Sequence, residues 1–217
     1  MQKIVRLLVR FIRQEVRNSN VLFSLGLYLL GVSYLIYLLS GNIPSDSAWN
    51  TLLWVVVFFG SVQLSSRSFE FESGPYFYYF QTIANAKHTI IAKMLFNVAY
   101  MMLLSMTTWA LFSVFFGNPV YSTALFFIGL ILGATGFSVV LTLTSGIAHR
   151  TKGNATLGAI LAIPLLFPVL QLTSAINLQA IVGVTLTDAA NLLGTLVALD
   201  MGIGLLAYLL FPYLWQD

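Results

Sequence analysis

Long apolar stretches separated by short polar connections dominate the sequence. The stretches lie at residues 21–40, 49–66, 94–116, 122–148, 155–175 and 192–215. Each has about the 20 residues that a helix needs to cross a hydrocarbon core about 30 Å thick. The pattern predicts an all-α, polytopic membrane protein with six transmembrane helices in a single transmembrane domain, residues 1–217. Residues 176–187 are apolar but too short to span, and we expect a lip or re-entrant segment there.

The N-terminal residues 1–20 follow a different pattern, in which basic and apolar residues alternate with helical spacing. Apolar residues recur on one side of the expected amphipathic helix. The basic residues on the other side are Lys3, Arg6, Arg10, Arg13 and Arg17. Such a helix lies in the membrane interface, with its arginines near anionic headgroups of the lipid bilayer. Two interpretations are open: a simple basic anchor, or an elbow helix packed beside the first span.

The composition supports a membrane protein, because 59% of the residues are hydrophobic and only 8% are charged. A soluble domain carries about a quarter charged residues. The chain has no cysteine, which excludes disulfides, cysteine-ligated zinc, iron–sulfur clusters and a thiol nucleophile. The net charge of +3 does not indicate nucleic-acid binding, since the basic residues are not interleaved with stacking aromatics.

The ten Lys and Arg residues fall on alternate connections between the expected spans. Five precede the first span, three lie at 67–93 and two lie at 149–154. The opposite connections, 41–48, 117–121 and 176–191, carry none. The positive-inside rule therefore places the N-terminus and both basic loops in the cytoplasm. Six spans then return the C-terminus to the cytoplasm.

The 67–93 loop is the only long cytoplasmic connection, and its sequence predicts a short coupling helix between spans two and three. Ser73 can cap this helix, and Pro75 falls near its first turn. Two glutamates precede it, where negative charge favours a helix N-terminus. The aromatic run that follows either floats among the headgroups or fits a groove on a soluble partner. The candidate coupling residues are Glu70, Glu72, Gly74, Pro75, Tyr76, Tyr78, Tyr79 and Phe80.

Three features inside the expected spans are candidates for function or packing. Pro164 and Pro168 lie in the fifth span, where they predict a kink that either aids packing or forms a hinge. Gly129 and Gly133 form a small-xxx-small surface in the fourth span, suited to packing within the chain or to a homodimer seam. Asp200 lies in the sixth span, where an ionisable group is costly and is a functional candidate.

No motif for independent catalysis is present in the sequence. It contains neither the P-loop pattern G-x-x-x-x-G-K-[ST] nor H-E-x-x-H. The two histidines, His88 and His149, fall at cytoplasmic edges of spans and are too isolated in sequence to indicate a metal site. We therefore expect no catalytic residues, no metal site and no directly bound cofactor.

The basic amphipathic helix, the six spans and a loop with Glu70, Gly74 and Lys93 resemble the permease subunits of ABC-2 type exporters. Within this group the chain is most similar to the haem exporter protein B family, the ABC transporter permease of cytochrome c maturation. The chain length, the E-S-G-P loop at 72–75, the turn at 150–153 and the proline pair of the fifth span carry the resemblance. It covers essentially the whole chain.

The resemblance implies a non-catalytic permease of the bacterial inner membrane that works with a cytoplasmic ABC ATPase dimer. It also implies a haem-handling membrane protein as a second partner. ATP hydrolysis would then drive haem export or the release of a haem-loaded periplasmic chaperone. The complex, and not this chain directly, would then bind haem. The spans show no evident ligand pair for a haem channel. The segment from Glu70 to Phe80 would transmit ATPase closure to spans two and three.

Three other functions fit parts of the same pattern. An ABC-2 permease that exports lipid, polysaccharide or drug would share the architecture and differ in its partners. A non-transporting membrane scaffold would have no ATPase partner and would tolerate changes in the coupling loop. An ion-coupled transporter would use Asp200 and should show inverted repeats, of which the two halves of the sequence show no sign.

Overall fold

The computed structural model describes residues 2–17, 19–41, 44–65, 86–150 and 155–215. These residues form helices throughout, joined by short turns, and no strand occurs among them. The all-α fold class is therefore confirmed for this part of the chain. The helices are α1 (Gln2–Arg17), α2 (Ser19–Ser40), α3 (Asp46–Ser65), α5 (Ala86–Phe116), α6 (Thr123–Arg150), α7 (Ala155–Val182) and α8 (Ala190–Trp215).

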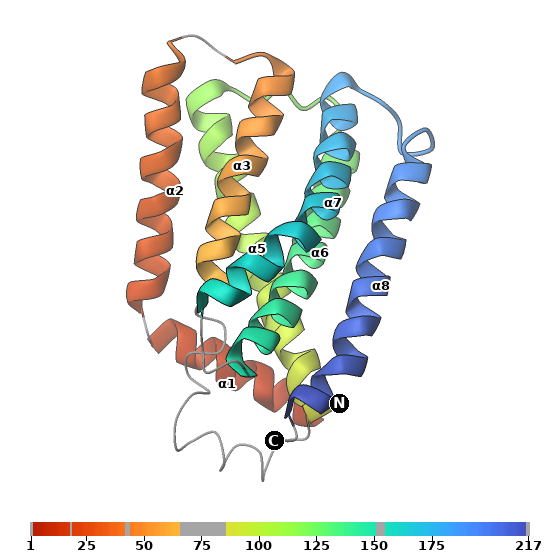
Figure 1. Cartoon of the computed structure of the whole chain (residues 1–217). Coiled ribbons are helices and arrows are strands. Elements are labelled where there is room, and N and C mark those ends of the chain that lie inside the picture. Colours follow the sequence, from red (N-terminus) through yellow and green to blue (C-terminus); the bar gives the residue numbers. More distant parts are fainter. Residues whose placement is uncertain (1, 18, 42–43, 66–85, 151–154, 216–217) are drawn as a thin grey trace.

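Helices α2 to α8 stand side by side as a bundle, and α1 lies across one end of it (Figure 1). Both termini lie at that end, whereas the α2–α3, α5–α6 and α7–α8 connections lie at the opposite end. Gly117 and Gly183 follow α5 and α7 directly, with positive φ angles of 83° and 87°. Glycine takes this left-handed conformation at little cost, so it ends both helices and starts the turns toward α6 and α8.

Five helices of the bundle, α2, α5, α6, α7 and α8, are long and apolar enough to cross a membrane. The chain is therefore a multi-pass membrane protein. Length and composition thus support five of the six expected spans. The remaining one, α3, begins with Asp46, Ser47 and Asn50, which shortens its apolar part. The expected lip or re-entrant segment at 176–187 is wrong for its first part, because α7 continues as a helix to Val182.

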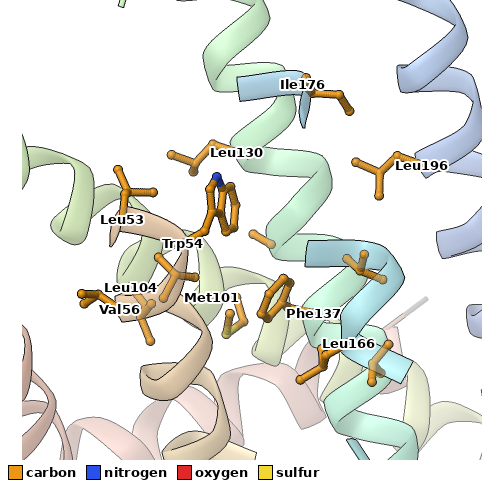
Figure 2. Packing of buried hydrophobic residues seen from close by; sticks show 14 of the residues in the cluster. Leu53, Trp54, Val56, Met101, Leu104, Leu130, Phe137, Leu166, Ile176 and Leu196 are labelled. Carbon is orange, nitrogen blue, oxygen red and sulfur yellow. The ribbon is translucent and has the colours of Figure 1, made fainter. Parts of the chain in front are cut away.

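Helix α6 forms the centre of the bundle, where it contacts α3, α5, α7 and α8. The Trp54 ring of α3 packs against the Phe137 ring of α6, with centroids 6.0 Å apart. Figure 2 shows these two rings among aliphatic side chains from α3, α5, α6 and α7. Trp49, earlier on α3, meets Phe112 of α5 edge-to-face at 5.9 Å. Two almost fully buried tryptophans thus hold α3 inside the bundle.

Hydrogen bonds between side chains add further contacts between the helices. The Asn50 Nδ2 of α3 donates to both the carbonyl oxygen and the hydroxyl oxygen of Ser174 on α7, at 2.9 Å each. The Asn97 Nδ2 of α5 donates to the Thr142 hydroxyl of α6 at 2.8 Å. Because the hydrocarbon core offers no water to polar groups, such bonds stabilise the contact between two spans.

Candidate functional site

The segment expected to couple the chain to an ATPase lies between α3 and α5. All eight candidate residues from Glu70 to Phe80 fall outside the described residues. The two helices on either side are described: α3 ends at Ser65 and α5 begins at Ala86. Both of these ends lie on the α1 side of the bundle (Figure 1). Residues 66–85 therefore connect two helix ends on the same side of the bundle.

A small buried cluster joins α1 to the first turns of α5. Phe11 of α1 packs against Ile90 and Ala92, and its ring centroid lies 6.2 Å from that of Phe96. The Nζ atom of Lys93 lies 5.7 Å from the centroid of the Phe11 ring, which is a cation–π geometry. Helix α1 therefore packs mainly against α5 and only in part beside α2, the first span.

A stripe of glycines on α6 lets neighbouring helices approach its backbone. A Cβ atom at Gly129 would collide with the side chain of Asn177 on α7. A Cβ at Gly133 would collide with Thr173 of α7 and would lie 2.9 Å from Cη2 of Trp54. Real Cβ atoms do not approach other atoms this closely, so neither position has room for a larger residue. Both glycines selected from the sequence thus face neighbours within the chain.

Gly136 continues this stripe and makes room for Asp200 of α8. A Cβ at Gly136 would collide with Oδ1 of Asp200 and lie 2.7 Å from Cγ1 of Val169. The Oδ2 atom accepts a hydrogen bond from the Thr135 hydroxyl at 3.2 Å. The same hydroxyl also donates to the Leu132 carbonyl at 2.7 Å, so one proton serves two acceptors. The Asp200 carboxyl therefore points toward α6 and α7, into the bundle.

The proline pair lies close to this site. Pro164 and Pro168 stand inside α7, and Figure 1 shows α7 changing direction between its two ends. Val169, the residue after the second proline, is the α7 residue that borders the Gly136 position. The structure thus brings the proline pair of α7 and the Asp200 carboxyl together, which their positions in the sequence do not predict.

The sequence analysis missed three residues of this region: Gly136, Asn50 and Asn177. Gly136 continues the stripe of Gly129 and Gly133 at helical spacing, so an extended search for small residues would have found it. Asparagine inside an apolar stretch is itself a signal for a contact between spans. Asn177 is fully buried, and neither polar atom of its amide has a hydrogen-bond partner among the described residues.

The described part of the chain offers close helix contacts and the carboxyl group of Asp200, which lies among them. No three His, Asp or Glu side chains within it come together as a metal site would require. What the arrangement provides is a set of connections between helices: α1 to α5, α3 to α7, and α6 to α7 and α8.

Comparisons with known proteins give a family match over nearly the whole chain. The model of a protein family described as CcmB protein matches residues 2–210. The match begins in α1 and ends within α8, so it includes the segment between α3 and α5. No curated protein and no solved structure matches the chain.

We expect Gly136→Ala to lower the thermal stability of the detergent-solubilised protein. The added methyl group must displace Asp200 or Val169, and overpacking of this kind costs about 1–3 kcal/mol. Gly202→Ala on α8 is the matched control, because a Cβ there would have no atom within 4 Å. Thermal unfolding, followed by loss of monodisperse elution, compares the two variants. Equal midpoints for both would contradict the close contact at Gly136.

Proposed function

Because the chain belongs to the CcmB protein family, we propose that it is the permease subunit of an ABC transporter complex for cytochrome c maturation. The observation that carries this proposal is the family match over residues 2–210. The long apolar helices of the bundle suit a subunit embedded in a membrane. The chain is a non-catalytic subunit in this proposal, and ATP hydrolysis takes place in a partner chain.

The partner that hydrolyses ATP is a cytoplasmic ATPase dimer, which docks on the segment from Glu70 to Phe80 between α3 and α5. A segment that joins two helices moves both when its docking groove closes. On one side, α5 carries α1 with it through the contacts of Phe11 with Lys93 and Phe96. On the other side, α3 is tied to α7 through the bonds from Asn50 to Ser174. Closure of the ATPase is in this way passed to both edges of the bundle.

Haem is the cargo of the pathway in this proposal. The complex contains a second, haem-handling membrane protein, and ATP hydrolysis drives either haem export or the release of a haem-loaded chaperone. The packing of the bundle favours release of the chaperone. Trp49, Trp54 and Phe137 are at most 2% exposed and pack between α3 and α6, so these rings would have to move before haem could pass between the two helices.

We place the protein in the bacterial inner membrane with six spans and with both termini in the cytoplasm. Helix α3 counts as a span because it runs beside its neighbours in the bundle (Figure 1) and buries both of its tryptophans there. The α1 end of the bundle is the cytoplasmic end, since the basic residues of α1 lie at it.

The first test is a pull-down of the tagged chain in mild detergent, with mass spectrometry of the proteins that accompany it. We expect an ABC ATPase together with a haem-handling membrane protein. Recovery of an ATPase without the haem-handling protein would support a permease but would indicate that it exports a substrate other than haem. Absence of any ATPase would contradict the proposal and favour a non-transporting scaffold.

We expect the double variant Tyr78→Ala, Tyr79→Ala to uncouple the ATPase from cytochrome c maturation. Removing the aromatic anchors takes away contact area with the ATPase groove, while the spans that direct insertion are unchanged. Cytochrome c yield and ATPase activity of the purified complex are the two readouts. Tyr121→Ala is the control, because Tyr121 is 78% exposed in the connection before α6, at the far end of the bundle. Normal maturation in the double variant would contradict the coupling role.

The absence of cysteine allows a direct test of the span count with single-cysteine variants. Ser45→Cys and Asn118→Cys lie before α3 and after α5. If both helices cross the membrane, a membrane-impermeant maleimide labels both positions in intact spheroplasts. If α3 does not cross, the two positions lie on opposite sides and only one is labelled. Gly153→Cys, in the basic 149–154 loop, should react only after permeabilisation.

A further inference from the structure

Helix α1 has two exposed faces beside the face that packs on the bundle. Leu7 and Phe11 belong to the cluster shared with α5. Val5, Val9 and Ile12 are 56%, 47% and 43% exposed, although all three are apolar. The bundle therefore covers only part of the apolar surface that α1 carries.

The exposed apolar residues form a strip that runs alongside a basic strip. At about 100° per residue, Val5, Val9 and Ile12 fall within about 60° of one another around the helix axis. Arg6 and Arg13, both exposed, lie on a strip about 90° further round. An apolar strip next to a basic strip is typical of a helix that lies at the boundary between acyl chains and headgroups.

The orientation of α1 is fixed, so the exposed apolar strip cannot turn toward the bundle. The Phe11 ring is held by the Phe96 ring at 6.2 Å and by Nζ of Lys93 at 5.7 Å. Figure 1 shows α1 lying across the end of the bundle. A helix in this position lies at the ends of the spans, and the bundle leaves both of its exposed strips uncovered.

The charge of α1 selects the kind of lipid. Residues 2–17 contain five basic residues and one acidic residue, Glu15, which gives a net charge of +4 (5 − 1). The occupant of this surface must offer negative charge and apolar chains side by side. An anionic phospholipid offers both, whereas a zwitterionic phospholipid lacks the net charge that basic segments attract.

We propose that α1 binds an anionic phospholipid, with its phosphate held by Arg6 and Arg13 and its acyl chains against Val5, Val9 and Ile12. This binding does not depend on the transport function, because it rests on α1 and its contacts with α5 alone. The bound lipid lies beside the first turns of α5, the helix that follows residues 66–85.

Native mass spectrometry of the full-length protein in mild detergent tests this binding, with phosphatidylglycerol and phosphatidylcholine as probes. We expect phosphatidylglycerol to bind more tightly. Each arginine contributes about fivefold in affinity for an anionic surface, so Arg6→Gln with Arg13→Gln should weaken phosphatidylglycerol binding about 25-fold. Asp46→Asn with Asp188→Asn, a charge change of the same size at the opposite end of the bundle, should change the affinity less than about twofold.

Two further measurements on the unaltered protein hold even if the double variant does not fold. Raising the salt from about 0.05 M to about 0.5 M should weaken phosphatidylglycerol binding, because the shorter screening length reduces the attraction. Glycerol phosphate, which has the charge but no acyl chains, should not bind. Equal binding of both phospholipids, tight binding of glycerol phosphate, or an unchanged affinity in a folded double variant would each overturn the proposal.

Discussion

Helices inside a membrane gain little from hydrophobic association, because lipid tails are as apolar as their side chains. The bundle therefore depends on how closely its helices approach, and the glycine stripe of α6 provides the closest approach. Gly129 and Gly133 admit side chains of α7, while Gly136 admits the Asp200 carboxyl of α8. On another side of α6, the ring of Trp54 packs on that of Phe137. The central position of α6 among four other helices follows from these contacts.

The joint between α1 and α5 depends on a different kind of contact, suited to the membrane surface. The Lys93 ammonium lies over the face of the Phe11 ring, and the same ring packs among apolar side chains of α5. An aromatic ring can satisfy both neighbours, because its face carries partial negative charge while its body is apolar. This contact fixes α1 at the place where the chain enters α5. The segment expected to bind the ATPase is thus followed by α5, whose first turns are held in place by α1.

Much of the helical framework could be predicted from the sequence, because spans and amphipathic helices leave long periodic patterns. The amphipathic segment at the N-terminus and the small-residue surface at Gly129 and Gly133 were visible for the same reason. The helix on which α1 packs could not be predicted from the sequence. Both α2 and α5 are apolar, and only the fold determines that Phe11 contacts α5. The continuation of α7 to Val182 could not be predicted, because residues 176–187 are apolar but too short to span a membrane alone. Apolar length alone cannot distinguish the outer turns of a span from a re-entrant segment.

The two prolines of α7 are compatible with a static kink or with a hinge. The contacts on either side of them differ, and this difference shows which end of α7 can move. Directly beyond Pro168, Val169 and Thr173 pack against the glycine stripe, and Ser174 accepts two hydrogen bonds from Asn50. Asn50 is buried, so these bonds are shielded from exchange with water, and this part of α7 moves together with α3 and α6. Any bending at the prolines is then confined to the Ala155 end, the end that faces the cytoplasm in the proposed orientation. A displacement delivered through α3 and α5 would change the angle of that end, while the outer part of the bundle stays packed.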